Sequence, residues 1–296
     1  MNNLQKINDK IISFFEKNEP FSIIRIGNME GHFLDCISRQ TFPIEQYFYW
    51  LSLTSGVYPI TPEYLVDIWT PINTDSMLNA DMLGFVDISG DVERNVFFRR
   101  DYCNDKFSFY GVKDIEILDP GILLDKNKII NPWTRQLKGK KVLVVTSHVN
   151  TIKEQWNNKE NIWGKYLDDI TPFELVDVIR SPFHPQMDDR QFPNCSTWDE
   201  SLNHMKNIID TYDYDVLFVG AAAYSPALAN HAKMRGKIGI TICGAIQLYF
   251  GIMGFRWTQD YYRDWHKLFN DFWKYPKEED LPKNRHVFDQ FEKAYW

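Results

Sequence analysis

Hydrophobic residues recur every three or four positions at the start of the chain. Within residues 4–17 they stand at Leu4, Ile7, Ile11, Phe14 and Phe15. This spacing predicts an amphipathic opening helix. The next segment, residues 21–26, is mostly apolar and predicts a buried strand that stops at Gly27. A second helix is predicted over residues 30–37.

The second half of the chain alternates short apolar runs with amphipathic segments. The predicted strands are residues 115–118, 140–146, 173–179, 215–219 and 238–242. The predicted helices are residues 151–156, 198–211, 225–235 and 245–250. Such alternation is typical of an α/β fold, so we predict one domain over residues 1–296, with a Rossmann-like, mostly parallel sheet and helices on both faces. Ligands of such sheets bind at the carboxyl ends of the strands.

Three stretches interrupt this pattern. Residues 45–110 are rich in aromatic side chains and contain several prolines, and we expect a mostly helical insertion there. Residues 180–197 are polar and proline-rich, which is typical of a loop long enough to act as a lid. From about residue 260 to 296 we expect a helical extension, with the charged run 277–280 exposed to solvent.

Net charge and the length of the apolar runs bear on partners and location. Lys and Arg total 33 and Asp and Glu total 40, which gives a formal net charge of −7. Binding to nucleic-acid phosphates needs a basic excess, so we expect no nucleic-acid partner. The longest apolar runs are far shorter than the roughly 20 residues that span a bilayer, and we expect no transmembrane segment. The polar N-terminus, without a secretory signal, predicts a cytoplasmic location.

Common catalytic and metal-binding motifs are absent from the sequence. It contains no G-x-S-x-G, H-E-x-x-H or G-x-x-x-x-G-K-[ST] string, which argues against the usual hydrolases, metalloproteases and P-loop enzymes. The four cysteines, Cys36, Cys103, Cys195 and Cys243, form no C-x-x-C pair, and we expect them to be reduced and structural. The seven histidines show no spacing typical of metal ligands.

The exit of the first predicted strand combines a cation, a turn and two oxygen-bearing side chains. Its sequence is Arg25-Ile26-Gly27-Asn28-Met29-Glu30. Asn28 and Glu30 stand two positions apart and can direct two oxygens toward one point. The same residues also fit a structural role, because Asn28 can cap the following helix and Glu30 favours its positive end.

Two later strand exits carry small residues followed by polar ones. Residues 220–226 allow backbone N–H groups and a helix N-terminus near Tyr224 to approach a phosphate, or allow a helix to pack closely on a strand. After the last predicted strand come Gly244 and Gln247, and then Arg256 in a glycine-rich segment. The Arg256 guanidinium can clamp a diphosphate, or it can bind the carbonyl groups at a helix end.

Several blocks of the sequence together resemble the GT-D-fold glycosyltransferases, a family first described as a domain of unknown function. The blocks are residues 138–145 with 151–156, residues 215–220 with 223–224, and residues 244–257, GAIQLYFGIMGFRW. The resemblance extends from about residue 20 to 260. Family members act in bacterial glycan and glycoprotein assembly. They carry an R-[YF]-G-D-G-E-like string whose D-x-E binds a metal ion and the nucleotide sugar, and the matching string here is residues 25–30.

The resemblance implies a set of site residues. Glu30 is implied as the catalytic carboxylate, either as a base or as a metal ligand. The implied donor-binding residues are Arg25, Gly27, Asn28, Gly220, Tyr224, Gly244, Gln247 and Arg256. Arg25 and Arg256 are expected to neutralise the leaving diphosphate.

The sequence departs from the family pattern at two places. Asn28 replaces the first acidic residue of the D-x-E string, and Met29 replaces a glycine. Ala222 and Ser225 stand where the family's G-x-G-x-Y-G loop has glycines. An amide keeps an oxygen ligand but removes a negative charge, so we expect Mn²⁺ or Mg²⁺ at Glu30 and Asn28 to be weakly bound or dispensable.

The function expected from these residues is transfer of a sugar from a nucleotide-sugar donor to a glycan or glycoprotein acceptor in polysaccharide assembly. Two alternatives stay open at this point. One is a relative that binds a nucleotide sugar or a glycan without catalysis. The other is an enzyme with a different nucleotide cofactor, such as a methyltransferase, although the usual glycine-rich loop after a strand is absent.

Overall fold

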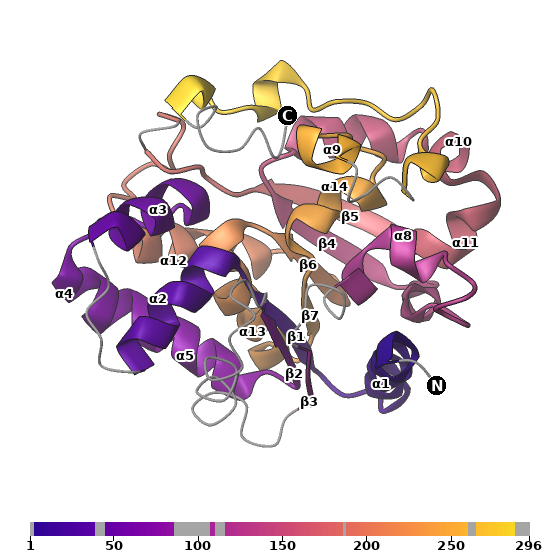
Figure 1. Cartoon of the computed structure of the whole chain (residues 1–296), viewed down its shortest axis with the longest axis horizontal. Coiled ribbons are helices and arrows are strands. Elements are labelled where there is room, and N and C mark those ends of the chain that lie inside the picture. The colour runs from indigo at the N-terminus through magenta and orange to yellow at the C-terminus, as the bar shows by residue number, and fades with distance from the viewer. Residues whose placement is uncertain are drawn as a thin grey trace.

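A seven-stranded parallel sheet runs through the centre of the molecule (Figure 1). The computed structural model describes residues 3–38, 45–85, 107–109, 116–185, 188–259 and 265–287. The strands are β1 (Ser22–Ile26), β2 (Met82–Phe85), β3 (Phe107–Phe109), β4 (Lys141–Thr146), β5 (Glu174–Arg180), β6 (Val216–Gly220) and β7 (Ile238–Thr241). Their order across the sheet is β3-β2-β1-β7-β6-β4-β5, and all neighbouring strands are parallel. The predicted α/β, Rossmann-like class is confirmed.

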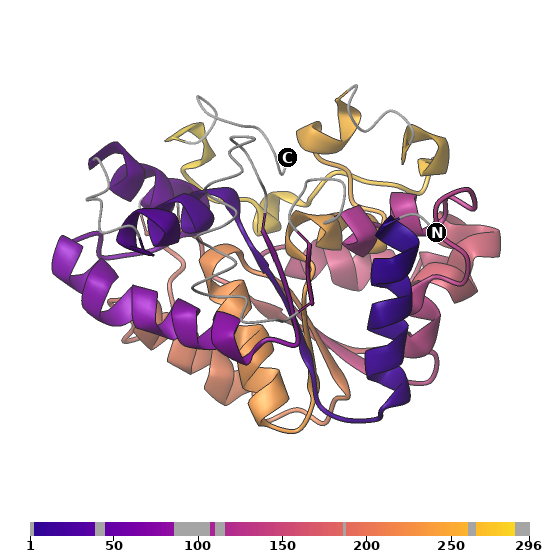
Figure 2. The same cartoon turned by 60° about the horizontal axis from the view of Figure 1, so that its bottom comes forward.

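Helices cover both faces of the sheet, and Figure 2 shows α1 on one side and α2 to α5 on the other. One face carries α1 (Asn3–Glu16), α8 (Pro120–Leu123), α9 (Val149–Trp156), α10 (Lys159–Trp163), α11 (Leu167–Ile170) and α14 (Ile246–Tyr249). The opposite face carries α2 (Asn28–Ser38), α3 (Glu45–Ser55), α4 (Pro62–Tyr64), α5 (Thr70–Asn79), α12 (Trp198–Ile209) and α13 (Ser225–Met234). No helix in these described ranges is long and apolar enough to cross a membrane.

Two hydrophobic cores form because strand side chains alternate between the faces. In β4, Val142 and Val144 belong to the core that includes α1 and α9, whereas Leu143 and Val145 belong to the core that includes α12 and α13. Burying a side chain of this size contributes about 1.5–3 kcal/mol to folding. The predicted opening helix is confirmed as α1, whose Ile11 is fully buried. Local signals also set helix ends, as at α12, where Thr197 and Glu200 form a capping box.

Three predictions about elements are wrong in part. The described part of the range 45–110 contains the predicted helices, but it also supplies the strands β2 and β3 beside β1 and is therefore part of the sheet instead of an insertion. Residues 116–118 form a 3₁₀ turn rather than a strand, closed by a hydrogen bond from Asp119 N to Glu116 O (2.8 Å). The described part of the C-terminal segment, residues 265–287, is an extended strap with three short 3₁₀ turns instead of a helical extension.

The topology creates a crevice between β4 and β6. The chain leaves β4 toward α9 on one face and leaves β6 toward α13 on the opposite face, although the two strands are hydrogen-bonded neighbours. In open α/β sheets, ligands bind at such a reversal, outside the carboxyl ends of the strands. The fold therefore directs attention to the loops that follow Thr146 and Gly220.

Candidate functional site

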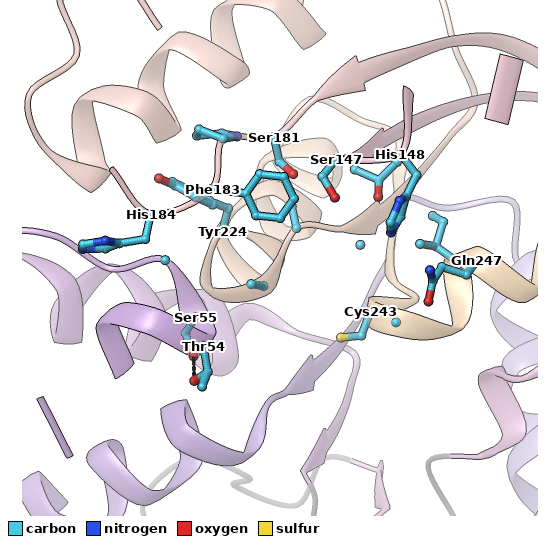
Figure 3. A pocket seen from close by; sticks show the side chains of 18 of the residues that line it. Thr54, Ser55, Ser147, His148, Ser181, Phe183, His184, Tyr224, Cys243 and Gln247 are labelled. Atoms are coloured by element: carbon cyan, nitrogen blue, oxygen red, sulfur yellow. Dashed lines mark hydrogen bonds between the residues drawn. The ribbon is translucent and has the colours of Figure 1, made fainter. Parts of the chain in front are cut away.

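A pocket lies at the carboxyl ends of four strands, and Figure 3 shows it from close by. Its empty volume is about 800 Å³ with the open mouth included. Residues 53–56, 146–148, 181–184, 220–222, Tyr224, Cys243, Gly244, Ile246 and Gln247 line it. These residues follow α3, β4, β5, β6 and β7, so the predicted position at the carboxyl edge of the sheet agrees with the pocket.

Two loops of the pocket have a left-handed backbone. Ala222 after β6 has a φ of 45° and Cys243 after β7 has a φ of 53°, a region that favours glycine. Strained conformations of this kind cluster at functional sites. Position 222 is one where the family resemblance leads us to expect glycine, and its backbone has the conformation that explains such a preference.

Gly220 serves close packing as well as lining the pocket. A Cβ atom at this position would lie 2.7 Å from the carbonyl oxygen of Cys243 and 2.7 Å from Cγ2 of Ile246. The packing alternative that the sequence left open is thus confirmed for Gly220. The missing side chain lets the loop after β7 approach the end of β6.

His148 provides a polar group that faces the pocket. It follows β4 and is 4% exposed, and in Figure 3 its ring points between Ser147 and Gln247. Within the described ranges, its Nδ1 and the neighbouring Thr146 Oγ1 have no hydrogen-bond partner. Burial lowers the pKa of His148 to about 4, and the charge of Arg180 adds to this while that of Asp280 opposes it. The imidazole is therefore neutral at pH 7.

The N-terminus of α9, directly after His148, is already capped by a carboxylate. Asp280 from the C-terminal strap is fully buried there. It accepts hydrogen bonds from the backbone N–H groups of Asn150 (3.0 Å) and Thr151 (2.6 Å) and from both of their side chains (3.0 and 2.7 Å). The strap thus fills the place where a helix N-terminus can bind an anion.

The loop after β5 forms part of the pocket wall and contacts α3. His184 turns its ring away from the pocket and shares a 2.7 Å hydrogen bond with Ser52, and burial lowers its pKa to about 4. Further along, Arg190 pairs with Asp188 and donates a hydrogen bond to the strap at Glu279 O (2.6 Å). The predicted lid loop is thus tied to the strap within its described residues.

A charged cluster borders the pocket at the ends of β1 and β7. Glu30 lies in the first turn of α2 and is buried, which raises the pKa of its carboxyl group. A hydrogen bond to its own backbone, one with the Ser55 side chain and the charge of Arg25 oppose this rise. The Nε atom of Arg25 is buried and has no partner among the described residues.

Asp119 is a second carboxylate of this cluster, which sequence reasoning missed. It precedes α8, and burial raises its pKa to about 7. The charges of Arg25 and Arg256 lower this pKa and that of Glu116 raises it. Its Oδ1 is buried without a hydrogen-bond partner in the part of the chain that the structure describes. The only local signal was an acidic residue before Pro120 at the end of an apolar run.

Ser55 and Cys243 connect the pocket to the charged cluster. Both line the pocket. Ser55 forms a side-chain hydrogen bond with Glu30. Burial is the main cause that raises the pKa of the Cys243 thiol. This pKa is also affected by the charges of the cluster, namely those of Arg25, Glu30, Arg256 and Asp119. The pocket and the charged cluster are therefore neighbouring parts of one candidate site.

The structure brings together most of the predicted site residues. Arg25 interacts electrostatically with Glu30 and with Asp119, and Arg256 interacts with Asp119. Gly220, Tyr224, Gly244 and Gln247 line the pocket. Gly27 lies beneath the Glu30 carboxylate. Asn28 is in the first turn of α2, and its side chain lies outside the described part.

Three of these residues also have structural partners. Tyr224 is buried and stacks on Trp198 with the ring centroids 5.2 Å apart. Gln247 accepts a hydrogen bond from the Trp257 indole (2.9 Å), and the Arg256 guanidinium lies 5.7 Å from the centroid of the same ring. Trp257 thus holds both side chains in place.

The described residues do not fit a divalent metal ion. The charge of Arg25 acts on both Glu30 and Asp119, and that of Arg256 acts on Asp119, so that these arginines oppose binding of a cation. Within the described ranges there is no group of three or more His, Cys, Asp or Glu residues suited to a metal.

Comparisons with known proteins add no assignment. No family model, curated protein or solved structure matches the sequence.

Proposed function

We propose that this chain is a glycosyltransferase that moves a sugar from a nucleotide-sugar donor to a hydroxyl group of a glycan or glycoprotein acceptor. One observation carries the proposal. Two buried carboxylates, Glu30 and Asp119, lie within electrostatic range of Arg25, and Asp119 lies within range of Arg256 as well, beside a pocket at the carboxyl edge of a parallel sheet. Glycosyl transfer needs both kinds of group, because a diphosphate leaves and an acceptor hydroxyl loses a proton.

The arginines are assigned to the leaving diphosphate. Arginine stays charged at any working pH, and its planar guanidinium matches phosphate oxygens. In a partly buried place, such fixed charges stabilise developing negative charge more than they do in water. Arg25 and Arg256 thus take the part that a divalent ion has in metal-dependent transferases.

The carboxylates are assigned to the reacting sugar and the acceptor. A pKa of about 7 suits Asp119 to take up a proton near neutral pH, and its Oδ1 has no partner among the described residues. Glu30, held by Ser55, is assigned to the donor sugar side. Both carboxylates are needed for turnover under this proposal.

The test is release of free nucleoside diphosphate from a panel of nucleotide sugars, with and without candidate acceptor glycans. We expect release by the parent chain and a loss of at least about tenfold, or about 1.4 kcal/mol of barrier, in Glu30→Gln. Glu16→Gln is the matched control, because Glu16 is exposed at the end of α1. Donor binding without any release would favour the non-catalytic relative. Cell fractionation tests the cytoplasmic location that belongs to this proposal.

A further inference from the structure

The pocket and the charged cluster differ sharply in charge. Among the described residues that line the pocket, none is Lys, Arg, Asp or Glu, and its two histidines are neutral at pH 7. Hydroxyl groups of Ser147 and Ser181 and the Phe183 ring supply much of the lining. An uncharged, partly flat and partly polar group fits such a lining, whereas a phosphate does not.

We propose that this pocket binds the nucleoside half of the donor and that Asp280 keeps phosphate groups out of it. The inference rests on the proposed function and adds the direction in which the donor lies. His148 indicates separately that the pocket binds a ligand. It is buried and directed into the pocket, and its Nδ1 has no hydrogen-bond partner within the described ranges.

Asp280 explains why the diphosphate lies elsewhere. The backbone N–H groups of Asn150 and Thr151 at the start of α9 are the donors that a phosphate in the β4–β6 crevice would use. Both are bound by the buried Asp280 carboxylate. A phosphate there would lose these donors and would face a like charge at close range.

The spacing of the strands sets the order of the donor's parts. β1, which carries Arg25 and leads to Glu30, is three strand positions from β4, which leads to His148. Neighbouring strands are about 4.8 Å apart, so the two ends of the site are separated by roughly 14 Å. The bond that breaks joins the sugar to the diphosphate, and the sugar therefore lies at Glu30 and Asp119. The nucleoside, on the other side of the diphosphate, reaches the pocket.

The lining supports a base in particular. Phe183 presents a flat ring in the centre of the view in Figure 3, and a nucleobase stacks on such a ring. Ala221 and Gly244 also line the pocket, and their small size lets a planar group approach the backbone. Neutral His148 offers one hydrogen-bond donor and one acceptor to the base or the ribose.

The first experiment measures binding of free nucleosides to the full chain by saturation-transfer NMR and calorimetry. The probes are uridine, cytidine, thymidine, adenosine and guanosine. We expect at least one of them to bind, and Phe183→Leu to weaken that binding at least fivefold. The control is Phe272→Leu, because Phe272 is exposed on the strap and does not line the pocket. Thermal melts of both variants confirm that they are folded.

The second experiment uses only the parent chain, so it does not depend on the folding of a variant. Pyrophosphate is titrated into the complex with the bound nucleoside. We expect both to bind together, because they occupy different parts of the site. Displacement of the nucleoside by pyrophosphate would overturn the inference.

The outcomes separate this inference from the proposed function. Transfer activity combined with no nucleoside binding, or with nucleoside binding that Phe183→Leu leaves unchanged, overturns the inference and leaves the function standing. Nucleoside binding that depends on Phe183, without any transfer, supports the pocket assignment and contradicts the function. Binding of a methyl glycoside in place of every nucleoside, with the same dependence on Phe183, also overturns the inference.

Discussion

The Glu30 carboxylate folds back over the backbone of Gly27, so that a Cβ atom at position 27 would lie 2.3 Å from Glu30 Oε2. Glycine at this turn is therefore required by the position of the carboxylate. The obstructing atom is the end of a flexible side chain, which can move at little cost in stability. The relationship links a turn residue to the chemistry of the site.

We predict that Gly27→Ala displaces the Glu30 carboxylate and lowers the rate of transfer at least about tenfold, equivalent to about 1.4 kcal/mol. The melting temperature should change by only a few degrees, since the backbone at Gly27 is not left-handed. Steady-state rates and thermal melts measure the two effects. In the Glu30→Gln background, the same alanine should cause little further loss, and additive losses would mean that Gly27 acts independently of Glu30.

A second prediction concerns the pH dependence set by Asp119. Because the pKa of Asp119 is raised to about 7, the transfer rate of the parent should rise with pH through about 7 as the carboxylate forms. Asp119→Asn should lose at least about tenfold in rate and this inflection with it. An unchanged pH profile in Asp119→Asn would assign the inflection to another group.

The raised pKa of Asp119 also predicts that stability falls with pH, whereas the transfer rate rises. A folded-state pKa of about 7, above the ordinary value of 3.8, means that the folded state holds the proton more tightly than the unfolded chain does. Protonated Asp119 makes its full contribution to the free energy of unfolding below about pH 4, and this contribution is lost as the pH rises through 7. When the pH is raised from 5 to 8, the free energy of unfolding measured with urea should therefore fall less in Asp119→Asn than in the parent.

A third prediction concerns Arg256, which we assign to the diphosphate. Hydrogen bonds to charged groups contribute about 1.5–3 kcal/mol, so Arg256→Ala should weaken donor binding by roughly 10- to 100-fold and leave a cooperative melt. Arg235→Ala is a matched control, because Arg235 pairs with Asp210 near the end of α13. Equal donor affinity in Arg256→Ala and the parent, by calorimetry, would make Arg256 structural.

A fourth prediction tests the amide at position 28. With Asn28 in place of an acidic residue, and with arginines near Glu30, transfer by the parent should change little when Mn²⁺ and Mg²⁺ are removed with a chelator. Asn28→Asp adds a charged oxygen and should raise the affinity for Mn²⁺, measured by titration with the donor present. Complete loss of the parent's activity in chelator would contradict this prediction.

The sequence predicted the parts of the site that depend on neighbouring residues. The apolar run before Gly27 and the alternation after residue 138 place the ends of β1 and β4 correctly and those of β6 and β7 to within one residue. Arg25 and Glu30 could be singled out because they stand next to a strand end. Burial of these residues follows from the whole fold, which a local pattern does not contain.

The rest of the site depends on residues that are distant in the sequence. Asp119 interacts electrostatically with Arg25, which is 94 positions away in the sequence. Asp280 accepts a hydrogen bond from Asn150, which is 130 positions away. Nothing in the spacing near Asp119 or Asp280 shows which partner each will have. The strand β3 was missed for another reason, since three residues are too few for a hydrophobic period to appear.

The strap that carries Asp280 also affects the order in which the protein matures during synthesis. The helix after β4 obtains its cap, and the loop after β5 obtains its anchor through Arg190, only when residues 279–281 have folded back onto the sheet. All seven strands precede these residues in the chain, so the sheet can form before the strap is synthesised. The part of the pocket wall that the strap anchors is therefore completed after the sheet, and a ligand that needs this wall is bound only once the strap is in place.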